Sequence, residues 1–179
     1  MAVSIEMIKQ LRELTSASVS DCKVALDDAK GDFHKAAELI KKRGLEIAAK
    51  KSTRAANQGR VEAYIHHGNK IGVLVEVNCE TDFVGRNEEF VRFTKDVAMQ
   101  IAATDPRYLK NEDVAAEVLA DMSDKQKADF FKVNCLMNQP FIKNDKLTIQ
   151  DYLTAIVAKI GENIVVRRFV RFRLGEDEK

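Results

Sequence analysis

Apolar residues in the first 45 positions fall into three groups, each with the three- and four-residue spacing of one helix face. Ser18 and Asp32 each precede a group and predict helix N-caps, whereas Gly31 and Gly44 predict helix ends. The apolar faces are Ile5, Met7, Ile8, Leu11 and Leu14; Cys22, Ala25, Leu26 and Ala29; and Phe33, Ala36, Ala37 and Ile40. Helices this short bury little surface, so we expect the module to keep a spare apolar face for a partner.

From residue 61 the apolar period changes to two. Val61, Ala63 and Ile65 alternate with polar neighbours, residues 67–70 form a turn, and alternation resumes over residues 71–77. Two antiparallel strands follow from this pattern. A third strand is predicted over residues 164–174, with Ile164, Val166, Val170 and Phe172 on one side and Arg167, Arg171 and Arg173 on the other.

Helical spacing returns between these strands. Asn87 caps a predicted helix that stops near Asp105, and Thr148 with Asp151 begins another that Gly161 closes. Shorter helical segments are predicted at about residues 111–122 and 124–137. The fold class is therefore α+β: an N-terminal three-helix module followed by a small antiparallel sheet packed with helices. We place the domains at residues 1–54, which include a basic linker, and 55–179.

Composition indicates a globular protein that stays in the cytoplasm. Of the 179 residues, 45% are hydrophobic and 32% charged, with a net charge of +1. No apolar run approaches the roughly 20 residues that span a bilayer, and charges appear too early for a secretory signal. Cys22, Cys79 and Cys135 are odd in number and widely spaced, which fits reduced thiols in a cytosol.

Motifs of nucleotide-binding enzymes and hydrolases are missing from the sequence. It has no Gly-x-x-x-x-Gly-Lys-Ser/Thr phosphate loop, no Gly-x-Gly-x-x-Gly and no Gly-x-Ser-x-Gly. His66 and His67 are adjacent on a predicted strand, so they face opposite sides and do not chelate one metal ion together. We therefore expect neither catalysis nor direct nucleotide binding, and no metal or cofactor.

Residues 77–87 place an aromatic ring where water reaches it. A run of β-forming residues ends just before this stretch and a helix signal follows it, so Phe83 is predicted to lie on a turn and point outward, beside Asp82. Burying such a ring against another protein is worth roughly 2 kcal/mol. We interpret this loop as a contact for a partner protein, against the alternative that the ring folds back onto the helix after Asn87.

Three stretches of the chain resemble bacterial translation elongation factor Ts, in its short form. They are Leu11-Arg12 followed by Asp21-Cys22-Lys23, Ala25-Leu26 and Gly31-Asp32; residues 76–84, Glu-Val-Asn-Cys-Glu-Thr-Asp-Phe-Val; and residues 158–164, Ala-Lys-Ile-Gly-Glu-Asn-Ile. The resemblance covers nearly the whole chain, in order. It implies a guanine nucleotide exchange factor that binds elongation factor Tu carrying GDP, loosens the nucleotide and its Mg²⁺, and lets GTP replace it.

The resemblance also assigns residues. Thr81, Asp82, Phe83 and Val84 match the family loop that perturbs the partner's Mg²⁺ site, with Phe83 wedged between partner helices. Arg12, Asp21, Cys22 and Lys23 match the part that docks on the partner's GTPase domain near its phosphate loop. The N-terminal module is expected to have a ubiquitin-associated-like fold.

The sequence also departs from the family pattern. Ser16 and Ser18 stand where the family usually has glycines, and many members continue into a second α+β half. Short members are said to pair, so we hypothesise a homodimer joined by the core domain through the strand at residues 164–174, whose edge would otherwise lie open.

A second function class stays open from the residues alone. The segment from Lys41 to Arg60 holds seven basic residues and one acidic residue, which is also typical of a small RNA-binding module associated with translation. Few aromatic residues lie near these charges, so we expect contact with nucleic acid to be incidental. Substitution of Phe83, or of Lys50, Lys51 and Arg54, separates the two classes.

Overall fold

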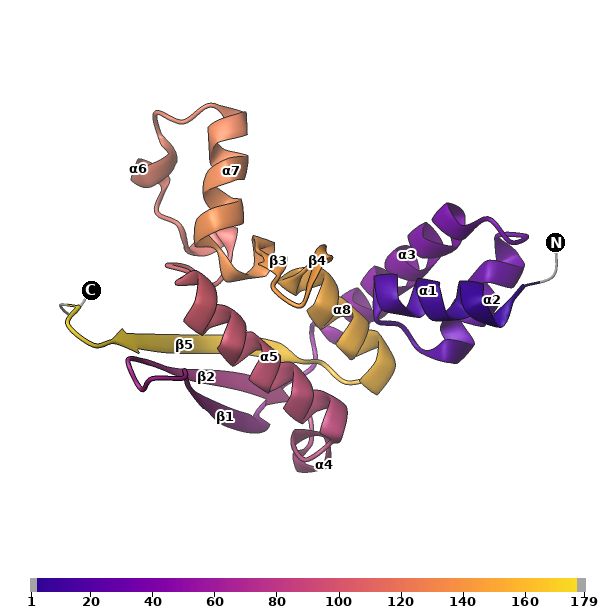
Figure 1. The fold of residues 1–179 in the computed structure, drawn as a ribbon, viewed down its shortest axis with the longest axis horizontal. Helices are drawn as coiled ribbons and strands as arrows, with labels where there is room; N and C mark the ends of the chain where they lie inside the picture. The colour runs from indigo at the N-terminus through magenta and orange to yellow at the C-terminus, as the bar shows by residue number, and fades with distance from the viewer. Residues whose placement is uncertain (1–2, 177–179) are drawn as a thin grey trace.

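The computed structural model describes residues 3–176 and has the predicted α+β architecture (Figure 1). The predicted domain limits at residues 1 and 179 lie outside this part, and the boundary after residue 54 stays a prediction. In chain order the elements are α1 (Ile5–Thr15), α2 (Val19–Asp28), α3 (Phe33–Lys51), β1 (Gln58–Ile65), β2 (Ile71–Cys79), α4 (Asp82–Gly85), α5 (Glu88–Thr104), η1 (Asn111–Asp113), α6 (Ala116–Leu119), α7 (Asp124–Asn134), η2 (Leu136–Asn138), β3 (Pro140–Phe141), β4 (Asn144–Thr148), α8 (Ile149–Ile160) and β5 (Val165–Arg173).

Helices α1 to α3 form a module with its own small core. The Ser18 and Asp32 side chains accept hydrogen bonds from the backbone N–H groups of Asp21 and Lys35, as expected of N-caps. Six buried residues make up the core: Leu11, Ala17, Cys22, Ala25, Leu26 and Ala36. A core this small buries little surface, so the module is marginal by itself.

The predicted end of the third helix at Gly44 is wrong. Helix α3 continues for 19 residues to Lys51, and Gly44 is buried inside it without the positive φ of a helix end. The reason is tertiary contact with α8: a Cβ on Gly44 would lie 3.3 Å from Cγ2 of Thr154. A glycine in mid-helix thus marks close helix packing rather than termination.

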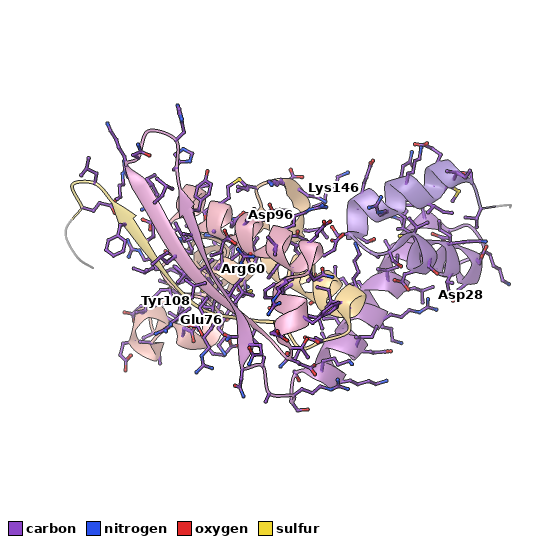
Figure 2. All side chains as sticks on the ribbon, turned by 90° about the horizontal axis from the view of Figure 1, so that it is seen from below. Asp28, Arg60, Glu76, Asp96, Tyr108 and Lys146 are labelled. Atoms are coloured by element: carbon purple, nitrogen blue, oxygen red, sulfur yellow. The ribbon has the colours of Figure 1, made fainter. Side chains whose placement is uncertain are left out.

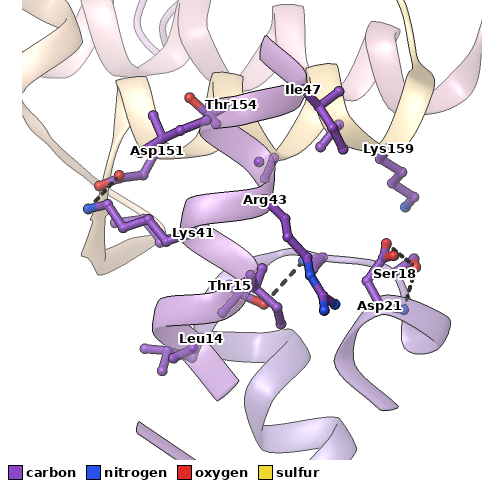
Figure 3. Close-up of a pocket in the computed structure, with 18 of the residues that line it drawn as sticks. Leu14, Thr15, Ser18, Asp21, Lys41, Arg43, Ile47, Asp151, Thr154 and Lys159 are labelled. Atoms are coloured by element: carbon purple, nitrogen blue, oxygen red, sulfur yellow. Dashed lines mark hydrogen bonds and ion pairs between the residues drawn. The ribbon is translucent and has the colours of Figure 1, made fainter. Parts of the chain in front are cut away.

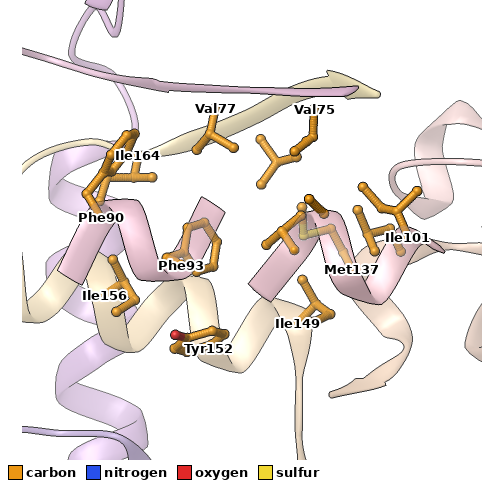
Figure 4. Close-up of a cluster of buried hydrophobic side chains, with 14 of the residues drawn as sticks. Val75, Val77, Phe90, Phe93, Ile101, Met137, Ile149, Tyr152, Ile156 and Ile164 are labelled. Carbon is orange, nitrogen blue, oxygen red and sulfur yellow. The ribbon is translucent and has the colours of Figure 1, made fainter. Parts of the chain in front are cut away.

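The main core has three layers. Helix α5 lies between the inner face of the sheet and α8 (Figure 4). Val75 and Val77 from β2 contact the α5 layer, and Phe90 and Phe93 of α5 are fully buried. Both the Asn87 cap of α5 and its end before Asp105 agree with the prediction.

The sheet has the order β1-β2-β5, with all neighbours antiparallel. The predicted strict alternation along the last strand is wrong after Arg167. There, Glu76 pairs with Arg168 and the next residue, Val77, pairs with Val166, so β5 carries an extra residue. A bulge reverses which side later residues face. Consequently Val170 and Phe172 point away from the core, whereas Arg171 lies beneath the sheet and donates to the Ala102 carbonyl.

The outer face of the sheet carries apolar side chains that no other described element covers, beside the Glu76–Arg168 ion pair. Val61 and Ile65 of β1, Leu74 of β2, and Val170 and Phe172 of β5 are between 41% and 63% exposed. The inward residues of β1 are polar instead: buried Glu62 accepts from the Thr94 hydroxyl and pairs with Arg60. The side chains around these strands are drawn in Figure 2.

Residues 105–148 differ most from the prediction. The helix expected over residues 111–122 is reduced to the short η1 and α6, and the helix expected over 124–137 ends at Asn134. A two-stranded hairpin, β3–β4, was not predicted. Gln139 accounts for part of this, because its side chain is buried and bonds Gln100 and Thr104 of α5. These are long-range contacts that local spacing does not encode.

Candidate partner-binding site

The Phe83 ring points to solvent, as the sequence predicts. It is 79% exposed and belongs to α4, a single helical turn rather than a plain turn. Thr81 caps this turn, with its hydroxyl accepting from the Val84 N–H at 3.3 Å. Asp82 is also exposed and forms an ion pair with Arg86. Thr81, Asp82 and Phe83 are thus all exposed on this turn, and Phe83 presents the apolar surface among them.

The underside of α4 is fixed to the sheet. Val84 and Gly85 are buried, and a Cβ on Gly85 would lie 3.4 Å from the carbonyl oxygen of Gly59 on β1. The Cys79 thiol donates to the Thr81 carbonyl at 3.1 Å. Val84 therefore holds the loop, although the resemblance groups it with the contact residues.

A second segment, distant in sequence, closes over the start of the loop. The Glu162 carboxylate accepts from the backbone N–H groups of Glu80 and Thr81, both at 3.1 Å, and from the Thr81 hydroxyl at 2.8 Å. In return, the Glu80 carboxylate accepts from the Asn163 N–H at 2.7 Å and pairs with Arg54 at 3.4 Å. Sequence reasoning missed Glu162; the only signal was its place in a stretch that resembles the family.

These contacts alter the acid–base properties of the loop. The Asn163 N–H holds the pKa of the Glu80 carboxyl below its ordinary value and Arg54 adds to this, while partial burial opposes it. Burial raises the pKa of the Cys79 thiol to about 11, with a further contribution from the Glu162 carboxylate. Cys79 therefore remains a neutral thiol, whereas Glu80 is ionised.

The second set of predicted residues lies on the three-helix module, on the side of the molecule that ends at the N-terminus in Figure 1. Arg12 is exposed in the last turn of α1, and Asp21 and Lys23 are exposed on α2. Cys22 is fully buried in the module core. Its side chain is therefore available for packing and not for direct contact with a partner.

A cavity of about 320 Å³ lies between the module and the core domain, beside the packing of α3 on α8 (Figure 3). Its walls come from the α1–α2 connection, α3 and α8. At its edge Lys41 bonds the Asp151 carboxylate at 2.9 Å, and Lys159 bonds Glu89 at 2.8 Å. The module is thus joined to the core through the packing of α3 on α8 and through the Lys41–Asp151 ion pair, whereas Lys159 and Glu89 join α8 to α5 within the core.

The basic run at Lys41 to Arg60 is partly neutralised in the fold. Arg43 pairs with Asp28, Lys41 with Asp151, Arg54 with Glu80 and Arg60 with Glu62. Within residues 3–176, the cations of this run without an ion pair are Lys42, Lys50 and Lys51. The run is a weaker polyanion site than its composition suggests.

Membrane-spanning helices and metal-binding clusters are both absent from residues 3–176. None of their helices has the length and apolar character needed to cross a bilayer. Across that same part of the chain, His, Cys, Asp and Glu side chains form no group of three suited to holding a metal ion.

A family model described as Elongation factor TS matches residues 3–130. The chain belongs to the elongation factor Ts family. Members of the family from Carboxydothermus hydrogenoformans, Anaeromyxobacter sp. and Caldanaerobacter subterraneus are 49%, 50% and 47% identical to it. Each alignment covers 97% of this chain and between 89% and 98% of the relative, so these elongation factors Ts are of similar length. The alignments span 195 positions against 179 residues here, so parts of these relatives lie opposite gaps in this chain.

Proposed function

We propose that this chain is a guanine nucleotide exchange factor of translation elongation. In this proposal it binds elongation factor Tu carrying GDP, displaces the Mg²⁺, and promotes release of GDP and its replacement by GTP. The nucleotide and the ion belong to the partner, and no covalent bond changes, so the chain acts through binding alone and needs no cofactor. This role belongs in the cytoplasm, where translation elongation takes place.

The observation that carries the proposal is the exposed Phe83 ring on a firmly anchored turn. A ring that is 79% exposed adds little to the fold, yet the loop beneath it is held by several hydrogen bonds. Burying the rest of the ring between partner helices contributes roughly 2 kcal/mol, which is about a 30-fold change in an equilibrium constant. Asp82 beside it brings a negative charge close to the partner's Mg²⁺ site.

The module supplies the second contact region. Arg12, Asp21 and Lys23 are exposed near the α1–α2 connection, and Val19 and Val24 of α2 are 55% and 45% exposed. We propose that this surface docks on the partner's GTPase domain. Cys22 supports the surface from inside the module.

Release of a fluorescent GDP analogue from elongation factor Tu, followed by stopped flow, tests the proposal. The wild-type chain is expected to accelerate release, and Phe83→Ala to lower the acceleration at least tenfold with an unchanged melting temperature. Val133→Ala removes an apolar side chain that is 65% exposed on α7, and it serves as the matched control. Equal acceleration by wild type and Phe83→Ala would show that the ring is not the active feature.

The RNA-binding alternative is separated by a charge variant. Arg54 pairs with Glu80 next to the loop, so neutralising it disturbs both candidate sites. Replacing Lys42, Lys50 and Lys51 by Gln removes the cations of the run that have no ion pair among residues 3–176. Under the exchange proposal this triple variant retains GDP release; under the RNA-binding alternative it loses RNA binding, while Phe83→Ala keeps it.

We also propose that two copies pair through the three-stranded sheet. β5 is an edge strand, and the outer sheet face beside it carries the exposed side chains of Val61, Ile65, Leu74, Val170 and Phe172. An apolar patch of this kind is typical of an interaction surface. Light scattering at micromolar concentration is expected to give twice the chain mass for wild type and the chain mass for Phe172→Glu; a wild-type monomer would remove this part of the proposal.

A further inference from the structure

Helix α4 is too short to hold its own shape. It has four residues, and an isolated turn of that length is unstable because nucleation fixes several dihedral angles for very few hydrogen bonds. Phe83 adds no burial that would hold it, since its ring is 79% exposed. The direction of the ring must therefore be set by groups outside α4.

The sheet holds the underside of α4, and Glu162 reaches its start from a segment about 80 positions later in the chain. Its two carboxylate oxygens take three hydrogen bonds: Oε2 accepts from the N–H groups of Glu80 and Thr81, and Oε1 accepts from the Thr81 hydroxyl. Hydrogen bonds to an ionised carboxylate are stronger and more directional than neutral ones. They fix the peptide unit that enters α4.

The bond to the Thr81 hydroxyl has a second effect. A hydroxyl that donates its proton to Glu162 presents a lone pair in another direction, and the Thr81 oxygen accepts from the Val84 N–H at 3.3 Å. Glu162 thus orients the oxygen that caps the helical turn. Phe83 lies between the capping residue and the capped N–H, so its backbone is fixed by the same bonds.

Glu162 itself is held in place. Gly161 ends α8 with a φ of +81°, which turns the chain so that Glu162 and Asn163 face the loop. The Asn163 N–H donates to Glu80, and its side-chain amide donates to the Arg54 carbonyl at 2.7 Å. The Glu162 carboxylate thus accepts from the backbone of Glu80 and Thr81, and the Glu80 carboxylate accepts from the backbone of Asn163. We call this reciprocal set of hydrogen bonds the clamp.

We propose that Glu162 is a positioning residue that sets the direction of the Phe83 ring. The inference rests on the proposed exchange function, because it assigns the residue that prepares Phe83 for entry into the partner. Without the carboxylate, the loop samples other conformations, and the apparent affinity falls in proportion to the fraction that stays aligned. Glu162 does not touch the partner; it acts through Thr81 and Glu80.

Amide hydrogen exchange measured by NMR tests the clamp without any partner. Glu162→Ala is expected to speed exchange at the N–H groups of Thr81 and Val84 at least tenfold and to leave Val75 in the centre of the sheet unchanged. Glu162→Gln keeps an oxygen that accepts from the backbone, so a smaller increase is expected. Glu117→Ala, an exposed glutamate on α6, is the matched control and should change none of these amides.

Stimulated GDP release tests the consequence. At subsaturating concentration, Glu162→Ala is expected to lower the release rate about tenfold, because fewer molecules carry an aligned Phe83. In a Phe83→Ala background it should lower the rate no further, since there is no ring left to position. A general loss of structure would lower the rate in both backgrounds, which distinguishes positioning from damage.

The outcomes separate the two proposals. If the wild-type chain fails to accelerate GDP release, the exchange function is wrong, while amide exchange still decides whether Glu162 orders the loop. Unchanged exchange at Thr81 and Val84 in Glu162→Ala overturns the clamp, and so does an equal loss of rate in both backgrounds. Where Glu162→Ala does not fold, Thr81→Val removes the hydroxyl that joins Glu162 to the Val84 N–H and keeps both backbone bonds to Glu162. It is expected to speed exchange at Val84, and unchanged exchange there overturns the proposal.

Discussion

Replacing Gly44 by Ala is expected to preserve or raise the stability of the protein, although the sequence pattern predicts a loss. At a helix end with positive φ, the new Cβ would cost about 1 kcal/mol or more. In the structure Gly44 has ordinary helical geometry inside α3, so alanine gains about 0.8–1.0 kcal/mol of helix propensity. The sign of the effect therefore reports whether α3 is continuous.

The gain is reduced by contact with α8. The Cβ of alanine would lie 3.3 Å from Cγ2 of Thr154, which is shorter than a comfortable carbon–carbon contact of about 3.5–4.0 Å. A shift of a few tenths of an ångström relieves it, and the net change is expected between 0 and about 1 kcal/mol. Thr154→Ser removes Cγ2 and keeps the hydroxyl bond to the Gln150 carbonyl. In the Thr154→Ser background the full propensity gain of Gly44→Ala should appear.

Gly161→Ala is the matched comparison, because both glycines were predicted to end helices. Gly161 has a φ of +81° and open space around its Cβ position, so alanine there should cost about 1–2 kcal/mol through backbone strain alone. Urea unfolding followed by circular dichroism measures both changes. A loss at Gly44 as large as that at Gly161, present also in the Thr154→Ser background, would refute a continuous α3.

Three further predictions concern stability. Gly59→Ala places a Cβ 2.2 Å from the Val77 carbonyl oxygen. The free energy of unfolding, measured by urea titration, should therefore fall by more than about 2 kcal/mol. A fall of less than about 0.5 kcal/mol would contradict the close approach of β1 and β2. Ser16 has a φ of +58°, so Ser16→Gly should raise the unfolding free energy by about 0.5 kcal/mol in the same assay, and a loss would show that the conformation is not strained. The hydrogen bond from Lys159 lowers the pKa of Glu89 in the folded protein below its ordinary value of 4.5. The pair therefore stabilises the fold at pH values above 4.5, and this contribution disappears as the pH falls through the lowered pKa of the folded protein. Glu89→Gln should therefore flatten the decline of melting temperature between pH 5 and 3. An unchanged decline would show that the Lys159–Glu89 pair does not contribute to stability.

Local chemistry predicted the beginnings of elements well. The caps at Ser18, Asp32, Asn87 and Thr148 are confirmed because a cap is a bond between a side chain and a backbone N–H two or three residues away. The exposure of Phe83 was predictable for a similar reason, since a strand end and a helix start leave few residues in which to turn a bulky ring inward.

Features that depend on distant segments were not predictable. The direction of Val170 and Phe172 depends on a bulge opposite Glu76, and the continuity of α3 past Gly44 depends on packing against α8. The contact of Glu162 with Thr81 joins residues about 80 positions apart in the chain. Periodicity records which side of an element is apolar, but not which other element covers it.

The path from the module to Phe83 bears on how the proposed exchange would work. Coupling between two ligands is reciprocal, so a factor that weakens GDP binding about 10⁴-fold binds the GDP form about 5.5 kcal/mol less well than the nucleotide-free form. Phe83 contributes roughly 2 kcal/mol of this, so the module must contribute as well. Helix α3, about 28 Å long at 1.5 Å per residue, joins the module to α8, and just beyond its end the Arg54 carbonyl accepts from Asn163, next to Glu162. A continuous helix followed by a hydrogen-bonded turn needs no ordering when the partner binds, so binding energy gained at the module can act at Phe83.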